Sequence, residues 1–194
     1  MIAVIDYGTG NIRSVLNAFG RLGCEPVLTS DPAQILAADH VILPGVGDCS
    51  VAMHNLRESG LAELVPQVQA PVLGICVGLQ MMCRHSEEGD VDCLDIFHTD
   101  VVKFTPAPGL KIPHMGWDRI SSLKSPLFKG LDDGAFVYYV HSYCPGLCDD
   151  TIAVSEHGLQ YSGALGRGNF YGCQFHPEKS AAVGEAILKN FLAL

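Results

Sequence analysis

The chain has 194 residues, of which 48% are hydrophobic and 17% are charged, and its formal net charge at pH 7 is −9. This length and apolar content predict one domain, residues 1–194, built around one large core. The acidic balance disfavours a nucleic-acid partner, because no basic excess exists to release counterions from a phosphate backbone. Residues 1–6 lack the basic start of a secretory signal and no apolar stretch is long enough to span a bilayer, so we expect a cytoplasmic protein without a membrane segment.

The first half of the chain alternates short apolar runs with segments whose apolar residues recur at helical spacing. The runs predict strands at 2–5, 26–29, 40–43 and 72–75. The helical spacing predicts helices over 12–22, 32–38, a segment through Met53 and Leu56, and a segment from Val77 onward. This alternation predicts an α/β, doubly wound, mostly parallel sheet, which binds ligands beyond the carboxyl ends of its strands.

The second half of the chain is mainly strand-like. Strands are predicted at 101–104, 116–120, 135–140, 152–155, 161–165 and 170–175. Because few helices separate these strands, we expect an antiparallel extension of the same sheet. A last helix carries its apolar residues on one face: Val183, Ile187, Leu188, Phe191 and Leu192.

Cys76 lies where the apolar run 72–75 changes to helical spacing, with Gly74 and Gly78 two residues before and after it. Glycine relieves both the strained backbone angles and the close contacts of a sharp strand-to-helix turn. The pattern predicts a nucleophile elbow with sulfur in place of a hydroxyl, and the helix N-terminus behind it would favour the thiolate. The alternative is a small buried thiol in a well-packed turn.

A thiolate nucleophile needs a base within hydrogen-bond reach and a group that orients the base. His176 and Glu178 follow the strand-like stretch 170–175, and Pro177 favours an extended backbone at His176. An extended His-x-Glu can place the carboxylate on Nδ1 and leave Nε2 free for the sulfur. The alternative is ordinary surface polarity.

The glycine-rich turn Gly45-Val46-Gly47 follows another predicted strand. Its backbone N–H groups, together with the N–H of Val77, could stabilise an oxyanion that develops beside the nucleophile. An ordinary strand-to-helix turn is the alternative.

The chain has eight cysteines without the paired spacing of a zinc ribbon, and we expect them to be reduced thiols. His141, Cys144 and Cys148 form the one His/Cys cluster to test as a metal site. No second ligand pair follows them at a usual spacing, so no metal site is predicted.

These motifs together resemble those of the class I, triad, glutamine amidotransferases. The motifs are residues 44–47 (PGVG), 74–80 (GICVGLQ) and 176–178 (HPE). Four further segments are similar to those of the glutaminase subunits of imidazole glycerol phosphate synthases: 6–11 (DYGTGN), 111–117 (KIPHMGW), 141–143 (HSY) and 174–180 (QFHPEKS). The resemblance covers nearly the whole chain and implies a flavodoxin-like, class I glutamine amidotransferase fold. Residues 91–98 depart from the pattern, because they lack the glycine-rich turn that the family has before 101–104.

The resemblance implies that the protein hydrolyses L-glutamine to L-glutamate and ammonia through a thioester. Cys76 would be the nucleophile, His176 the base and acid, and Glu178 the group that holds His176. The resemblance also implies a set of residues that bind the substrate. The side chains of Gln80 and Glu88 would hold its α-amino group, and the backbone of His141, Ser142 and Tyr143 its carboxylate.

No cofactor and no metal follow from the resemblance, but a partner does. The ammonia would pass to a cyclase subunit, in a heterodimer that makes imidazole glycerol phosphate and AICAR in histidine biosynthesis. The partner-facing residues implied are Asn11, Met115, Trp117, Tyr138 and Lys179. The family also suggests that the Gly45-Val46 peptide must reorient before its N–H faces the oxyanion, so we expect little glutaminase activity without the partner.

Three other functions stay open from the sequence. The first is a triad amidotransferase that serves another acceptor, the second a non-catalytic regulatory subunit with the same fold, and the third a thiol hydrolase of free γ-glutamyl substrates. The presence of Cys76, His176 and Glu178 together argues against the second, since a chain that had lost activity would normally have lost at least one of them.

Overall fold

The computed structural model describes residues 1–8 and 12–194. Its central sheet has seven strands: β1 (Ile2–Ile5), β2 (Val27–Thr29), β3 (His40–Leu43), β4 (Val72–Ile75), β11 (Thr151–Glu156), β12 (Gln160–Arg167) and β13 (Phe170–Cys173). The strand order is β11-β12-β13-β4-β3-β1-β2. The five strands from β13 to β2 are parallel, and β12 and β11 add an antiparallel edge. The predicted doubly wound, mostly parallel sheet with an antiparallel extension is confirmed.

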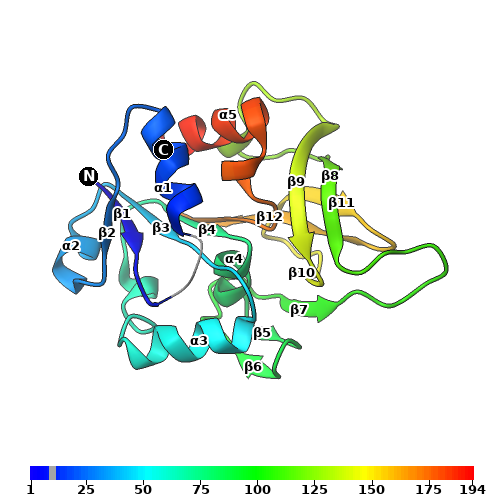
Figure 1. Ribbon diagram of the computed structural model, residues 1–194, viewed down its shortest axis with the longest axis horizontal. Helices are drawn as coiled ribbons and strands as arrows, with labels where there is room; N and C mark the ends of the chain where they lie inside the picture. Colours follow the sequence, from blue (N-terminus) through cyan, green and yellow to red (C-terminus); the bar gives the residue numbers. More distant parts are fainter. Residues whose placement is uncertain (9–11) are drawn as a thin grey trace.

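Helices cover both faces of this sheet: α1 (Ile12–Arg21), α2 (Pro32–Leu36), α3 (Cys49–Glu58), α4 (Val77–Met82) and α5 (Ala181–Phe191). In Figure 1, α1 and α5 lie on one side of the sheet and α3 lies on the other. Every residue of β1 and β4 is buried, as is typical of parallel strands that have both faces covered. In the part of the chain that the structure describes, no helix is long and apolar enough to cross a membrane. Three short 3₁₀ helices complete the helical elements described: η1 (Val65–Gln67), η2 (Pro126–Phe128) and η3 (Pro177–Lys179).

The antiparallel extension is narrower than predicted. The segments 101–104, 116–120 and 135–140 form two separate sheets instead of joining the central one. One is a four-stranded sheet of β10 (Tyr143–Pro145), β7 (Asp100–Lys103), β5 (His85–Ser86) and β6 (Val91–Asp92); the other is the hairpin β8 (His114–Ile120) and β9 (Ala135–His141). Side chains of β8 that point to solvent alternate with less exposed ones, so the hairpin packs one face on the molecule and needs no place in the main sheet.

Residues 91–98, which lack the family's glycine-rich turn, still form an ordered connection. The N–H groups of residues 94–96 donate to the carbonyls of residues 81–83 at 2.9–3.0 Å. These bonds satisfy carbonyl groups at the carboxyl end of the short helix α4, which would otherwise be unpaired. The loop therefore holds in place the helix that begins at Cys76.

Candidate active site

The carboxyl ends of β3, β4 and β13 meet at one edge of the central sheet, as the topology predicts. Cys76 connects β4 to α4 with φ +53° and ψ −108°, a strained conformation for a residue that carries a side chain. Its N–H donates to the carbonyl of Cys173 at 2.8 Å, and its carbonyl accepts the N–H of Gln80 at 3.1 Å. The predicted sharp strand-to-helix turn is confirmed, and it holds a nearly buried thiol.

The glycines around Cys76 are required by close packing. A Cβ added to Gly78 would lie 1.9 Å from the carbonyl oxygen of Leu43, and one added to Gly74 would lie 2.4 Å from the terminal methyl carbon of Met82. Gly45 packs against the same turn, because its Cβ would lie 2.4 Å from the nitrogen of Gly78. The turn after β3 and the elbow after β4 are thus in direct backbone contact, with Gly45 beside Val77 and Gly78.

His176 reaches the same edge from the end of β13. Its Nδ1 lies 2.8 Å from Oε1 of Glu178, and both side chains are only 2% exposed. The backbone differs from the prediction: His176 is extended, but Glu178 belongs to the 3₁₀ helix η3. Because proline fixes φ in the helical range, Pro177 starts a tight turn that brings the carboxylate back under the imidazole.

The ionisation of His176 depends on opposing effects. Burial lowers its pKa, but hydrogen bonds to Cys76 and Glu178, with the charges of these two groups, raise the pKa to about 9. An imidazole that is protonated at neutral pH beside a thiol favours a thiolate–imidazolium pair. Nδ1 is occupied by Glu178, so Nε2 is the nitrogen left for the sulfur.

Ser180 attaches this histidine to the hairpin. Its buried hydroxyl accepts the N–H of Tyr138 at 2.9 Å and donates to the carbonyl of His176 at 2.6 Å. The N–H of His176 in turn donates to the carbonyl of Tyr138 at 2.9 Å. Strand β9 therefore fixes both backbone polar groups of His176.

A cavity of about 430 Å³ opens beside Cys76 and His176. Its volume lies within the range of small-molecule sites. It is lined by Val46, Gly47, Cys76, Val77, Gln80, Glu88, Pro113, Val140, His141, Ser142, Tyr143, His176 and Lys179. The structure therefore brings together ten of the residues predicted for catalysis, the oxyanion, the substrate and the partner, while Gly45 and Glu178 support the lining from behind.

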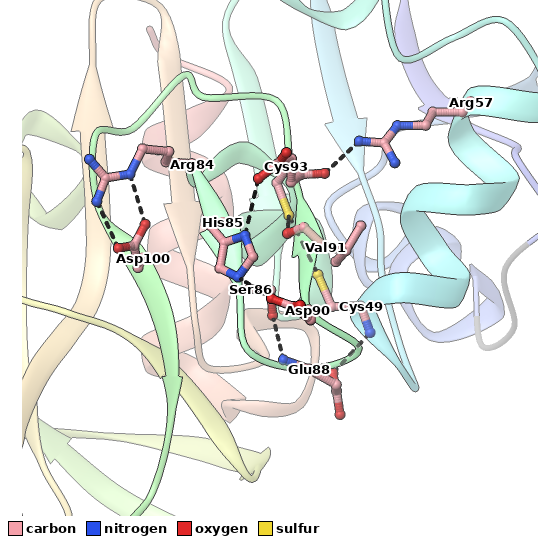
Figure 2. A network of polar contacts seen from close by, with 11 residues as sticks. Cys49, Arg57, Arg84, His85, Ser86, Glu88, Asp90, Val91, Cys93 and Asp100 are labelled. Atoms are coloured by element: carbon pink, nitrogen blue, oxygen red, sulfur yellow. Dashed lines mark hydrogen bonds and ion pairs between the residues drawn. The ribbon is translucent and has the colours of Figure 1, made fainter.

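Glu88 is anchored at the start of α3. Its Oε2 accepts the N–H of Cys49 at 2.9 Å, and its own N–H donates to Ser86 Oγ at 3.2 Å. Figure 2 shows this carboxylate turned toward the first residue of the helix. Burial raises the pKa of Glu88, and the N–H of Cys49 opposes the rise. A half-buried carboxylate in the cavity wall is suited to an ammonium group.

Gln80, on the short helix α4, is buried. Its Nε2 donates to the carbonyl of Tyr143 at 3.0 Å and to Oε1 of Gln174 at 3.1 Å. The same Tyr143 carbonyl accepts a bond from Nδ1 of His141 at 2.8 Å. The sequence analysis did not predict a role for Gln174 or Ser180. Gln174 lies two residues before His176 in a stretch predicted to be extended, and this spacing places the two side chains on the same side of the backbone.

Three of the predicted partner residues, Met115, Trp117 and Tyr138, lie on the hairpin, and Lys179 lies on η3 in the cavity wall. Met115 is 63% exposed and Trp117 is 52% exposed, so the tryptophan is not a core residue. Trp117 pairs with Tyr138 across the hairpin, and Lys179 Nζ lies 6.0 Å from the Tyr138 ring centroid. Asn11 lies outside the described residues.

His114, Asp118 and His157 place possible metal ligands within 4.8 Å of one another. The rings of His114 and His157 are stacked at 4.0 Å with an interplanar angle of 6°, so their nitrogen lone pairs lie in nearly parallel planes and do not converge on one ion. In the cluster considered from the sequence, both ring nitrogens of His141 are already engaged, by Tyr143 and Tyr161.

Comparison with known proteins identifies the family of the chain. Residues 3–194 match the family "Glutamine amidotransferase class-I". The fold is also that of a solved glutamine amidotransferase, with a TM-score of 0.76 at 16% identity over 100% of this chain and 98% of the other. The chain belongs to the class I glutamine amidotransferase family.

Relatives within the family are more specific. The chain is 54% identical to "Imidazole glycerol phosphate synthase subunit HisH" of Bacteroides fragilis strain YCH46, over 100% of this chain and 99% of the relative. It is 45% identical to the protein of the same description from Escherichia coli K12, over 100% of this chain and 99% of that one.

Proposed function

We propose that the chain is the glutaminase subunit of an imidazole glycerol phosphate synthase. It hydrolyses L-glutamine to L-glutamate and ammonia and passes the ammonia to a cyclase subunit, which makes imidazole glycerol phosphate and AICAR in histidine biosynthesis. The observation that carries this function is the 54% identity with a HisH subunit over the full chain. The chemistry is supported by Cys76 and His176, which line one cavity, and by Glu178, which accepts from His176 behind them.

The first step is attack by Cys76 Sγ on the side-chain amide carbon of glutamine. The thiol proton is held by His176, whose raised pKa lets the imidazolium persist beside the thiolate. The C–N bond then breaks, and His176 Nε2 gives its proton to the departing nitrogen, which leaves as ammonia. Water attacks the resulting γ-glutamyl thioester, its proton passes to His176, and glutamate and the thiol are released. Glu178 keeps the imidazole in the tautomer that this exchange requires.

The tetrahedral intermediates carry a negative oxygen beside the elbow. The N–H of Val77 and the Gly45-Val46 peptide stabilise this oxygen, and the backbone contact between Gly45 and Gly78 keeps the two turns adjacent. Because Gly45 and Val46 follow β3 and Val77 follows β4, a movement of one turn relative to the other changes the number of donors at the oxyanion. Such a movement would link glutaminase activity to the partner.

The other end of glutamine binds farther along the cavity. Gln80 and Glu88 face the α-ammonium group with a carbonyl oxygen and a carboxylate, and the backbone of residues 141–143 holds the α-carboxylate. The cyclase covers the face that carries Met115, Trp117, Tyr138 and Lys179, with Asn11. The eight free thiols are compatible with the reducing cytoplasm.

The test is ammonia release from glutamine by the purified chain, with and without a cyclase subunit carrying its ribonucleotide ligand. We expect a large increase with the liganded cyclase that is absent in Cys76→Ala. No increase with this cyclase, but an increase with another synthase, would move the chain to a different acceptor. High activity without any partner would favour a free γ-glutamyl hydrolase, and no activity under any condition would favour a regulatory subunit.

A further inference from the structure

A buried row of side-chain amides runs from the nucleophile to the wall of the glutamine cavity. Gln174 is 0% exposed, and its Nε2 donates to Cys76 Sγ over 3.6 Å. Its Oε1 accepts from Nε2 of Gln80 at 3.1 Å. Gln80 Nε2 donates in addition to the carbonyl of Tyr143 at 3.0 Å. Gln174, just after β13, thus shares one hydrogen-bonded row with Gln80 of α4 and Tyr143 of β10.

The carbonyl of Tyr143, at the end of the row away from Cys76, determines which group donates in each hydrogen bond. The carbonyl of Tyr143 only accepts hydrogen bonds, so Gln80 must turn its NH₂ group toward it. The second hydrogen of this NH₂ group requires an acceptor, and Gln174 therefore presents its oxygen to Gln80. The NH₂ group of Gln174 is then directed at Cys76 Sγ.

From this geometry we infer that Gln174 is a positioning residue that stabilises the Cys76 thiolate and fixes which atom of Gln80 faces the substrate. The inference rests on the proposed role of Cys76 as nucleophile. A hydrogen bond to an ionised acceptor is stronger than one to a neutral acceptor, so the N–H of Gln174 favours the thiolate over the thiol. His176 acts on the same sulfur as a proton partner, whereas Gln174 has no proton to exchange.

The second effect concerns specificity. Gln80 Oε1 is buried and has no hydrogen-bond partner within residues 1–8 and 12–194, although Gln80 lines the cavity. Since both N–H groups of Gln80 are used, the side chain of Gln80 has only its oxygen, an acceptor, left for a ligand. A substrate group placed there must donate, as the α-ammonium of an amino acid does, and a ligand that presents an acceptor there would leave both groups unpaired.

Two substitutions separate the parts of this inference. Gln174→Glu keeps the size and the oxygen that accepts from Gln80, but places a carboxylate oxygen beside the sulfur. Gln174→Leu removes the donor to the sulfur and the acceptor for Gln80 together. Gln160→Leu, at an exposed glutamine of β12, is the matched control.

The readout is the rate at which iodoacetamide alkylates Cys76, followed by mass spectrometry of the Cys76 peptide in the folded chain. We expect both Gln174 variants to react about tenfold more slowly than the parent at neutral pH, and as fast as the parent at strongly alkaline pH, where stabilisation of the thiolate no longer limits the reaction. The Gln160→Leu control should match the parent at both. Circular dichroism establishes whether each variant is folded. If Gln174→Leu does not fold, Gln174→Glu alone provides the test.

The assay needs no glutamine turnover, so it remains informative if the proposed function is wrong. An error in the proposed function would be detected separately, as ammonia release by Cys76→Ala. Unchanged alkylation at neutral pH in a folded Gln174→Glu chain would overturn the inference. Slower alkylation at both pH values would also overturn it, because this result would mean reduced access to the sulfur.

Discussion

Replacement of Glu178 by glutamine separates the charge of this residue from its shape. Glutamine keeps an oxygen that can accept the Nδ1–H of His176, at a position where the present distance is 2.8 Å. Both side chains are 2% exposed, so solvent does not screen the interaction appreciably. The substitution should therefore leave the imidazole in place and remove the negative charge that favours its protonated form.

The size of the effect follows from the pKa of His176. Burial lowers this pKa, and hydrogen bonds and charges from Cys76 and Glu178 raise it from 6.5 to about 9. This rise corresponds to about 3 kcal/mol in favour of the protonated form. If Glu178 supplies half of it, Glu178→Gln lowers the pKa by about one pH unit and reduces kcat/KM roughly tenfold.

The sign of the effect on stability can also be tested. A pKa that is higher in the folded state stabilises the fold below the unfolded value of 6.5, and this contribution is lost as the pH rises through about 9. The free energy of unfolding of the parent should therefore decline between these pH values. In Glu178→Gln the decline should be smaller and should end at a lower pH.

The assay is an NMR titration of the His176 imidazole, assigned with His176→Gln, together with kcat/KM for glutamine hydrolysis in the presence of liganded cyclase. Glu185→Gln is the matched control, because Glu185 is exposed and pairs with Lys189. An unchanged His176 midpoint in a folded Glu178→Gln chain would refute the reasoning.

Three further outcomes follow from other parts of the structure. Gly78→Ala places a Cβ 1.9 Å from the carbonyl of Leu43 and should lower the free energy of urea unfolding by about 3 kcal/mol; an unchanged midpoint would contradict this. Ser180→Ala removes a buried hydroxyl that bridges β9 and His176, the proposed base, and should lower kcat more than it raises KM in steady-state assays. Burial lowers the pKa of His141 to about 3, and burial with the charge of a nearby histidine lowers that of His114 to about 4. The unfolded chain therefore binds more protons than the folded chain below pH 6.5, and the free energy of unfolding should fall as the pH falls below this value. The fall should be less steep in His141→Phe.

The elbow and the parallel half of the sheet could be predicted because their signals are local. Gly74, Cys76 and Gly78 mark a strand-to-helix turn within five residues, and the buried runs before Pro44 and Cys76 are typical of parallel strands. The end of each strand then places its turn at the same sheet edge. His176 and Glu178 are only two residues apart, which is why their contact was predictable even though η3 was not.

Other features depend on contacts that sequence spacing does not encode. The hairpin β8–β9 has the alternating pattern of any half-exposed pair of strands, and nothing in that pattern excludes it from the central sheet. Gln80 and Gln174 are 94 residues apart, and Cys49 and Glu88 are 39 apart. A polar residue on a helix predicts exposure until its partner from another strand is known.

The most direct test of the central claim is to trap the γ-glutamyl thioester. The chain, in complex with liganded cyclase, is mixed with glutamine, quenched with acid within one turnover and digested for mass spectrometry. We predict a glutamyl group on the peptide that contains Cys76 and none on this peptide in Cys76→Ser. Glu178→Gln should accumulate more of the glutamyl peptide if the substitution slows hydrolysis of the thioester more than its formation. Continued ammonia release by Cys76→Ala, with no glutamyl group on the parent peptide, would contradict the proposed mechanism.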